Sequence, residues 1–291
     1  MTKKILVDNK ESKKYRHLWW KISRKSVLKR IFTERLTEPL HLNLLSIIVA
    51  LFGTTRAKIN FDLIARQQHA YGLLWAADEA KKLGYSTVTI IELGVAAGIG
   101  FLNLCSIASR VTRVTGVNFE LIGVDSGKGL PVPRDYRDHP ELYKEGGGIM
   151  DYDKLKQMLP ENAFLVLGDV EETVPQVLDM FSPENPLGFV CLDLDYYWST
   201  KEALKIFLGA PEKYLPWVAI YVDDIFLMKH NHWCGEYLAV DEFNNENIMR
   251  KIEQHRFLQT ERIFKNARWI EQIFFLHILD HPVRSVPQRV I

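Results

Sequence analysis

The sequence is poor in cysteine, and its longest apolar run is short. Only three cysteines are present among 291 residues, all far apart and none in a CxxC pair. A disulfide scaffold and a cysteine-ligated zinc site are therefore excluded, and a reducing, cytoplasmic location is expected. No apolar run precedes the basic residues at the start, so a signal peptide is not expected. The apolar run at residues 39–55 contains His41 and Asn43 and is too short for a convincing membrane span.

The overall composition is that of a globular protein. Hydrophobic residues make up 47% of the chain and charged residues 25%, with 17 Gly and 12 Pro. These values exclude collagen-like and wholly disordered chains. The predicted organisation is a basic, apolar, helical N-terminal extension over residues 1–60, followed by one α/β domain over residues 61–291.

Charge is distributed unevenly along the chain. Residues 1–36 carry 12 Lys/Arg against 3 Asp/Glu, whereas the rest carries 25 against 33. Two interpretations of residues 1–55 stay open. Residues 39–55 form a buried or dimer-forming helix, which would make a homo-oligomer, or the segment makes peripheral contact with an anionic membrane. No nucleic acid is expected as a partner, because the basic run contains no known reading motif.

Helical and strand patterns alternate from about Phe61 onward, which predicts a mostly parallel sheet flanked by helices. Five short apolar runs are predicted strands, at residues 88–93, 119–124, 164–167, 188–192 and 218–222. Helices are predicted at residues 65–83, 100–110, 151–158, 170–180, 199–208 and 240–254. Two last runs, at residues 257–264 and 270–279, are expected to pair antiparallel.

A glycine-rich turn follows the first predicted strand. It reads Glu92-Leu-Gly94-Val-Ala-Ala-Gly98-Ile-Gly100, a GxxxGxG spacing that differs from the GxGxxG dinucleotide fingerprint. Asp125, followed by Ser126, ends the second strand, where an acid commonly binds a ribose diol. The turn and the acid therefore predict a nucleotide-like ligand at this edge of the sheet.

Further acids follow the next three strands. Asp169 ends the third strand and either binds a ligand amino group or caps the next helix. Asp193 and Asp195 follow the fourth strand, and Asp223 and Asp224 follow the fifth. Carboxylates brought together repel one another unless a cation is bound or one of them is protonated. The pattern favours an oxygen-ligated divalent cation such as Mg²⁺.

Several segments match a known pattern in order and interval: IELGVAAGIG, GVDSGKGLP, LGDVEETVP, DLDYYWST, YVDDI and GEYLAVDEF. Together they resemble the class I S-adenosylmethionine-dependent methyltransferases, and most of all the macrocin O-methyltransferase (TylF-like) family. The resemblance covers roughly residues 61–279. It implies a Rossmann-like α/β sheet, mostly parallel with the last strand antiparallel. The chain has DLDYY where the family usually has DGDLY, and DSGKGLP where it has DSFEGLP; both departures affect the acceptor side.

The resemblance also implies roles for individual residues. The cofactor S-adenosylmethionine would be bound by Glu92, Gly94, Gly98, Asp125, Ser126 and Asp169. The divalent metal, taken as Mg²⁺, would be bound by Asp193, Asp223 and Asp224, with Asp195 as the catalytic base. Such a cation would orient vicinal hydroxyls of a small-molecule acceptor, for example a sugar or glycolipid, while Asp195 removes a proton.

Two other groups of residues are candidates for the acceptor side. His230 and His232 follow the acidic pair and are alternatives for the base. The long connection at residues 127–151 has the length of a lid or clamp. Its candidate contacts to the acceptor are Arg134, Tyr136, Arg137 and Asp138.

Two competing functions stay open at this stage. An NAD-dependent oxidoreductase would use a similar sheet, but the glycine spacing and the acidic pair disfavour it. A non-catalytic, membrane-associated scaffold would have no need for converging carboxylates. The sequence therefore favours an O-methyltransferase.

Overall fold

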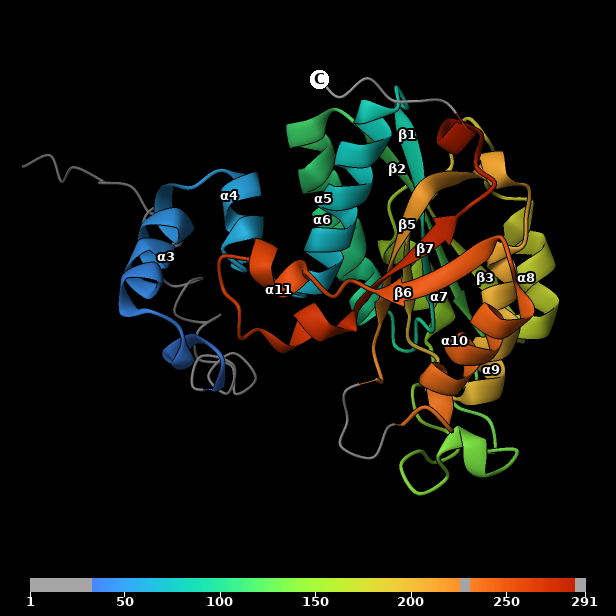
Figure 1. The fold of residues 1–291 in the computed structure, drawn as a ribbon. Coiled ribbons are helices and arrows are strands. Elements are labelled where there is room, and N and C mark those ends of the chain that lie inside the picture. The colour runs from blue at the N-terminus through green and yellow to red at the C-terminus, as the bar shows by residue number, and fades with distance from the viewer. Residues whose placement is uncertain (1–32, 226–230, 286–291) are drawn as a thin grey trace, which may run out of the picture.

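A mostly parallel seven-stranded sheet forms the centre of the molecule (Figure 1). The structure is a computed structural model, and it describes residues 33–225 and 231–285. The strands lie in the order β3-β2-β1-β4-β5-β7-β6, and β7 is antiparallel to both of its neighbours. Their bounds are β1 Thr87–Leu93, β2 Asn118–Asp125, β3 Ala163–Leu167, β4 Leu187–Leu192, β5 Tyr214–Val222, β6 Arg250–Gln254 and β7 Ile273–Ile278. The predicted α/β fold with an antiparallel last strand is confirmed.

Helices cover both faces of the sheet. Their bounds are α3 Leu40–Phe52, α4 Thr55–Asn60, α5 Gln67–Lys82, α6 Ile99–Thr115, α7 Tyr152–Met158, α8 Val170–Leu178, α9 Tyr197–Ala203, α10 Gly235–Glu246 and α11 Leu258–Glu261. Helices α5 and α6 pack on one face, and α8 and α10 pack on the other. The α3 helix lies apart from these layers (Figure 1).

Alternation along the strands explains why there are two apolar cores. In β1, Ile90 packs into the core under α5 and α6, while Ile91 packs into the core under α8 to α10. In β4, Phe189 and Val190 divide in the same way. Successive side chains of a strand point to opposite faces, so a parallel strand covered on both faces must be apolar at every position. This explains the continuous apolar runs of the buried strands β1, β2, β4 and β5, whereas the edge strand β3 is apolar but partly exposed.

The C-terminal part corrects two predictions. The helix predicted at residues 240–254 ends at Glu246, and its last five residues are instead strand β6. The Asn244 side chain accepts from the backbone N–H of Ile252 at 2.7 Å and donates to the Ile252 carbonyl at 2.8 Å, which holds the new strand beside the helix. The strand predicted at residues 257–264 is the short helix α11 and a turn. The antiparallel partner of β7 is therefore β6.

Candidate active site

The glycine turn after β1 requires glycine for steric reasons. Gly94 has a φ of 89°, and a Cβ built there would lie 1.8 Å from the Asp193 carbonyl oxygen. No side chain fits so close to another strand's backbone. Gly98, with a φ of 82°, is the N-cap of α6. The first turn thus brings the backbone of β1 directly against the end of β4.

Asp125 fixes this turn from the neighbouring strand. Its Oδ2 accepts the backbone N–H groups of Val95 at 2.9 Å and Ala96 at 2.8 Å. Its Oδ1 accepts the N–H of Gly127 at 2.6 Å. The acid that ends β2 therefore organises two loops at the same edge of the sheet.

A cavity of about 320 Å³ opens at this edge, beyond the carboxyl ends of the parallel strands. Four of the residues predicted from sequence to bind the cofactor line it: Gly94, Asp125, Ser126 and Asp169. Glu92 and Gly98 are not among its lining residues. The acids Asp193 and Asp195 line it from the next strand.

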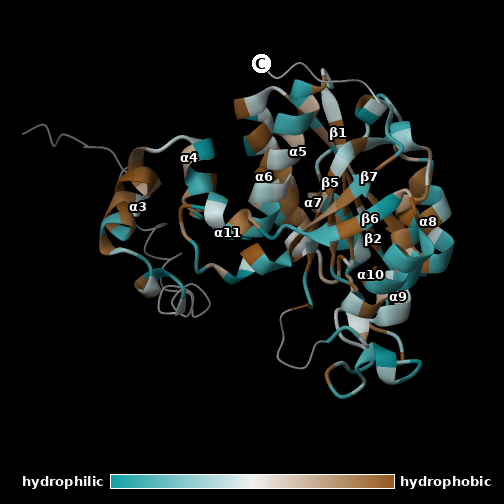
Figure 2. Ribbon diagram, in the orientation of Figure 1, coloured by the Kyte–Doolittle hydropathy of each residue, from teal (hydrophilic) through white to brown (hydrophobic). Residues whose placement is uncertain are grey.

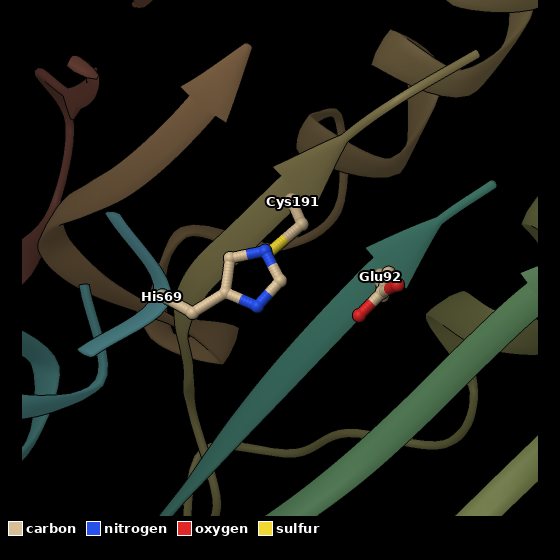
Figure 3. Close-up of side chains that lie close together, drawn as sticks. All are labelled: His69, Glu92 and Cys191. Carbon is tan, nitrogen blue, oxygen red and sulfur yellow. The ribbon is translucent and has the colours of Figure 1, made fainter. Parts of the chain in front are cut away.

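Glu92 points into the core instead. It lies on the same face of β1 as Ile90, and it is only 3% exposed. Figure 3 shows the His69 ring reaching from α5 toward the side chains of Glu92 and of Cys191 on β4, and one ligand atom from each lies within 4.8 Å of the others. His69 Nδ1 and Glu92 Oε2 have no hydrogen-bond partner.

Burial makes this inner group uncharged at neutral pH. Burial, followed by the nearby Arg66 charge, lowers the pKa of His69 to about 3. Burial raises the pKa of Glu92 to about 8, although Arg66 opposes the shift. Loss of solvation disfavours the charged form of either side chain. We refer to His69, Glu92 and Cys191 as the inner group.

A second group of acids lies where the cavity meets the ends of β4 and β5. Carboxylate oxygens of Asp193, Asp195 and Asp224 lie within 4.8 Å of one another. Burial, followed by the neighbouring acids Asp223 and Asp224, raises the pKa of Asp193 to about 8. Burial and a hydrogen bond with Asp224 raise the pKa of Asp195 to about 9. We refer to Asp193, Asp195 and Asp224 as the outer group.

The structure places the acids of the outer group differently from a simple strand pattern. Strand β4 ends at Leu192, and Asp195 has a left-handed φ of 61°. A turn after the strand, and not the alternation of side chains along it, therefore brings Asp195 beside Asp193. Asp223 continues the alternation of β5 and accepts a hydrogen bond from the hydroxyl of Tyr221. Its carboxylate is not part of the outer group, whereas that of Asp224 is.

Glu236 was not singled out from the sequence, yet it holds the outer group in place. It is fully buried in the first turn of α10. Its Oε2 accepts the backbone N–H of Asp224 at 3.0 Å, and its Oε1 accepts that of Leu194 at 3.4 Å. One side chain therefore connects the loops after β4 and β5. Its signal in the sequence was the segment GEYLAVDEF, whose role only the tertiary contacts define.

The connection at residues 127–151 folds back over the cavity. Leu130 exchanges backbone hydrogen bonds with Gly146 and Gly147, at 2.9 and 2.8 Å. Tyr143, from the same connection, lines the cavity and is hydrogen-bonded to Asp224, and burial raises its pKa. The connection thus supplies one wall of the cavity and reaches the outer group.

A neighbouring cavity of about 280 Å³ contains three of the four acceptor-side candidates. Arg134 stacks on the Trp198 ring at 3.4 Å, and Asp138 accepts the N–H of Arg134 at 2.7 Å. Arg137 lies over Tyr197 at 4.5 Å. Trp198 borders both cavities, so the two are adjacent. Tyr136 is exposed and lines neither.

Of the two candidate histidines, only His232 belongs to the described residues. His230 lies outside the described residues. His232 is exposed, with its Nδ1 2.7 Å from Asp241 Oδ2, and it does not line the cavity. Asp195, in contrast to His232, lines the cavity.

Comparison with known proteins gives the fold. No family model matches the chain, and no curated protein matches it. A crystal structure described as CalS11, a calicheamicin methyltransferase, is 16% identical to this chain over 93% of each chain, with a TM-score of 0.50. The O-methyltransferase TomG from Streptomyces achromogenes, solved with S-adenosylmethionine, is 14% identical over 74% of this chain and 80% of its own, but its TM-score of 0.39 is too low to support an argument. The chain therefore has the Rossmann-like fold that is found in CalS11.

Proposed function

We propose that this protein is an S-adenosylmethionine-dependent O-methyltransferase, assisted by a divalent cation, that acts on a hydroxyl of a sugar, a glycolipid or a related small molecule. The observation that carries the proposal is the position of the outer group. Three carboxylates converge, and two of them, Asp193 and Asp195, line the same cavity as the glycine turn and Asp125. A hydroxyl to be methylated must meet both a methyl donor and a proton acceptor, and this cavity offers a place for both.

The lining residues fit the methyl donor. The backbone of Gly94 can approach a ligand closely, and Asp125 stands at the end of the adjacent strand, in the usual position for binding a ribose diol. Ser126 and Asp169 extend the polar lining away from the outer group. We assign this end of the cavity to the nucleoside part of S-adenosylmethionine.

The outer group fits a hard divalent cation such as Mg²⁺. All three ligands are carboxylates, which such cations prefer. Asp224 Oδ2 is buried and has no hydrogen-bond partner. Asp193 and Asp195 have pKa values raised to about 8 and about 9, so without a cation the group holds protons at neutral pH. A positive charge among the carboxylates would favour their ionised forms.

The mechanism follows from these positions. When bound, S-adenosylmethionine supplies an electrophilic methyl group, and the cation lowers the pKa of an acceptor hydroxyl. Asp193 and Asp224 would hold the cation, and Asp195 would accept the hydroxyl proton on a carboxylate oxygen. Glu236 connects the loops after β4 and β5 through its two hydrogen bonds. Tyr143 is hydrogen-bonded to Asp224 and forms the adjacent wall of the cavity. Asp223, the third ligand expected from sequence, remains a prediction.

Binding measurements test the proposal without knowledge of the acceptor. We expect S-adenosylmethionine to bind in calorimetry and NAD to give no heat. We expect Mn²⁺, used as a spectroscopic probe for Mg²⁺, to bind one site in the purified protein. A protein that binds NAD in place of S-adenosylmethionine would be an oxidoreductase, and the proposal would be wrong.

Two adjacent variants then locate the cation. Asp224→Ala should abolish Mn²⁺ binding while S-adenosylmethionine binding persists, because Asp224 belongs to the outer group. Asp223→Ala is the matched control, and it should retain more Mn²⁺ binding because the Asp223 carboxylate is engaged by Tyr221. Methyl transfer from labelled S-adenosylmethionine to a panel of sugars and glycolipids should be lost in EDTA. Full transfer in EDTA would contradict the role of the cation.

A further inference from the structure

The helix α3 has its polar and apolar sides reversed. Its only buried residue is Ser46, whose hydroxyl donates to the Leu42 carbonyl at 2.9 Å. The amide of Asn43 donates to the Arg35 carbonyl at 2.8 Å, toward the chain that precedes the helix. Leucine, isoleucine and phenylalanine side chains occupy the opposite side and are exposed: Leu40, Leu44, Leu45, Ile47, Ile48 and Phe52. A helix in contact with water normally shows the opposite arrangement.

The exposed apolar residues share one side of the helix with the exposed His41. Leu40, Leu44, Ile47 and Ile48 recur at the spacing that places side chains on one helix face. Figure 2 shows this helix as a brown element that stands apart from the body of the protein. We refer to its six exposed apolar residues as the α3 face. An exposed apolar surface of this kind marks a site of interaction.

The start of α3 is fixed firmly to the rest of the molecule. Arg35 is buried, donates to the Phe61 carbonyl at 2.6 Å and lies 3.6 Å over the Phe264 ring. Glu38 is also buried, and its Oε1 accepts the backbone N–H groups of Lys265 and Asn266 at 2.5 and 2.6 Å. Charged groups are buried in this way only when they are paired. The α3 face is therefore held outward by specific contacts.

We propose that the α3 face inserts into the surface of an anionic lipid membrane. The helix has 13 residues, which corresponds to a length of about 20 Å. This is shorter than the hydrocarbon core, about 30 Å thick. None of the described helices is long and apolar enough to cross a membrane. The helix thus lies along the surface, with its apolar face at the boundary between headgroups and acyl chains.

Charge selects the lipid surface over a second copy of the chain. Residues 1–36, which lead into α3, carry 12 Lys/Arg against 3 Asp/Glu. Two copies joined through α3 would bring two strongly basic segments together, and these would repel each other. An anionic lipid surface attracts the same segment. This proposal is independent of the methyl transfer proposed above.

Vesicle co-sedimentation of the full chain tests the proposal. We expect the protein to sediment with vesicles of phosphatidylcholine and phosphatidylserine, and to do so less with phosphatidylcholine alone or at high salt. The double variant Leu44→Glu/Ile48→Glu should reduce binding at least tenfold, because burial of one such side chain contributes more than that factor. Recovery of the wild-type protein in the supernatant with anionic vesicles at low salt would overturn the proposal.

A matched pair of single variants separates the helix from exposed apolar residues in general. Phe52 on the α3 face is 82% exposed, and Ile248 in the turn between α10 and β6 is 80% exposed. Phe52→Glu should weaken vesicle binding, whereas Ile248→Glu should not. Both side chains are largely exposed, so both variants should fold, and unchanged thermal unfolding verifies this. Equal binding of the wild type and Phe52→Glu would overturn the role of the α3 face.

Light scattering tests whether a second copy of the chain binds the α3 face instead of a membrane. We expect the full chain to have the mass of one copy without vesicles. A dimer that Leu44→Glu/Ile48→Glu converts to a monomer, together with no vesicle binding, would assign the α3 face to a second copy and overturn the membrane proposal.

Discussion

The inner and outer groups both include residues on or just after β4, but they differ in their access to water. Cys191 of the inner group and Asp193 of the outer group are two residues apart, yet Cys191 is within the sheet and Asp193 lies just past its end. Burial raises the pKa of acids in both groups, that of Glu92 to about 8 and that of Asp195 to about 9. The side chains of the inner group are buried, so their neutral forms are the most stable. Two acids of the outer group line a cavity, and the proposed cation would reach them from it.

This difference shows how position along a strand separates structure from chemistry. An acid within a covered strand, such as Glu92, is held neutral by its surroundings and serves packing. An acid one or two residues beyond the strand end can change its protonation or bind a ligand. Functional residues of an open α/β sheet are therefore expected beyond the carboxyl ends of its strands. The following predictions test this contrast.

Removal of the proton acceptor in the outer group should have the largest effect. Asp195→Asn preserves the shape of the side chain but cannot accept the hydroxyl proton. We expect kcat to fall by about 10²–10⁴-fold, as for the loss of a general base, with S-adenosylmethionine affinity unchanged. Steady-state kinetics and calorimetry measure the two quantities. Wild-type kcat in this variant would contradict the assignment, and the base would then be sought at His230 or His232.

Neutralisation of the acid in the inner group should change stability in a pH-dependent manner. Glu92 retains its proton in the folded protein up to a pKa of about 8, but in the unfolded chain it releases it near the ordinary value of 4.5. The unfolded state then binds fewer protons, so stability falls as pH rises from 4.5 to 8. At pH 7 this costs the wild type about 3 kcal/mol. Glu92→Gln has no such titration and avoids the cost.

Urea unfolding of both proteins near pH 5 and near pH 8 measures this effect. We expect the stability of Glu92→Gln relative to wild type to rise by about 3 kcal/mol between these pH values. A hydrogen bond that is merely gained or lost in the variant would change its unfolding free energy by the same amount at both pH values. Glu161→Gln, at an exposed acid, is the control and should follow the wild type. Parallel profiles for Glu92→Gln and wild type would show that Glu92 is ionised in the folded protein.

The sequence was sufficient for the parallel part of the sheet because its strands are continuous apolar runs, which burial on both faces explains for all of them except the edge strand β3. It was misleading for Arg250–Gln254, an edge strand whose polar residues continue the pattern of α10. The strand depends on pairing with β7, which is distant in the sequence. It also depends on the hydrogen bonds of the Asn244 side chain, which form only in the folded protein. Tertiary contacts of this kind are not encoded in local periodicity.

The sequence indicated which strand ends would form the site, but not which side chains at those ends would face it. Sequence order placed acids after β2, β3, β4 and β5, and the structure brings the first three of these strand ends to one cavity, with Asp224 after β5 in contact distance of its acids. It assigned both Asp223 and Asp224 to the metal, and it could not show that Asp223 accepts a hydrogen bond from Tyr221 while Asp224 lies beside Asp193 and Asp195. Nor could it show that Glu92 points inward, toward His69 on a separate helix. Side-chain direction at a strand end is set by its neighbours.

The smallest expected effect is at Asp125, which is at the same edge as the outer group but is already satisfied by backbone N–H groups. Asp125→Ala removes the acceptor for Val95 and Ala96 as well as the predicted partner of the ribose hydroxyls. We expect S-adenosylmethionine binding to weaken by about 1.5–3 kcal/mol, the contribution of hydrogen bonds to a charged group. Calorimetry measures this directly.

Asp169→Ala is the matched control for this variant. Asp169 lines the same cavity at the end of the next strand, but its side chain makes no capping hydrogen bond to α8. Its loss should therefore leave the glycine turn intact and weaken binding less than the loss of Asp125. Equal affinity of Asp125→Ala and wild type would remove Asp125 from the cofactor site. A larger loss in Asp169→Ala would instead place the main polar contact of the cofactor at the end of β3, away from the glycine turn.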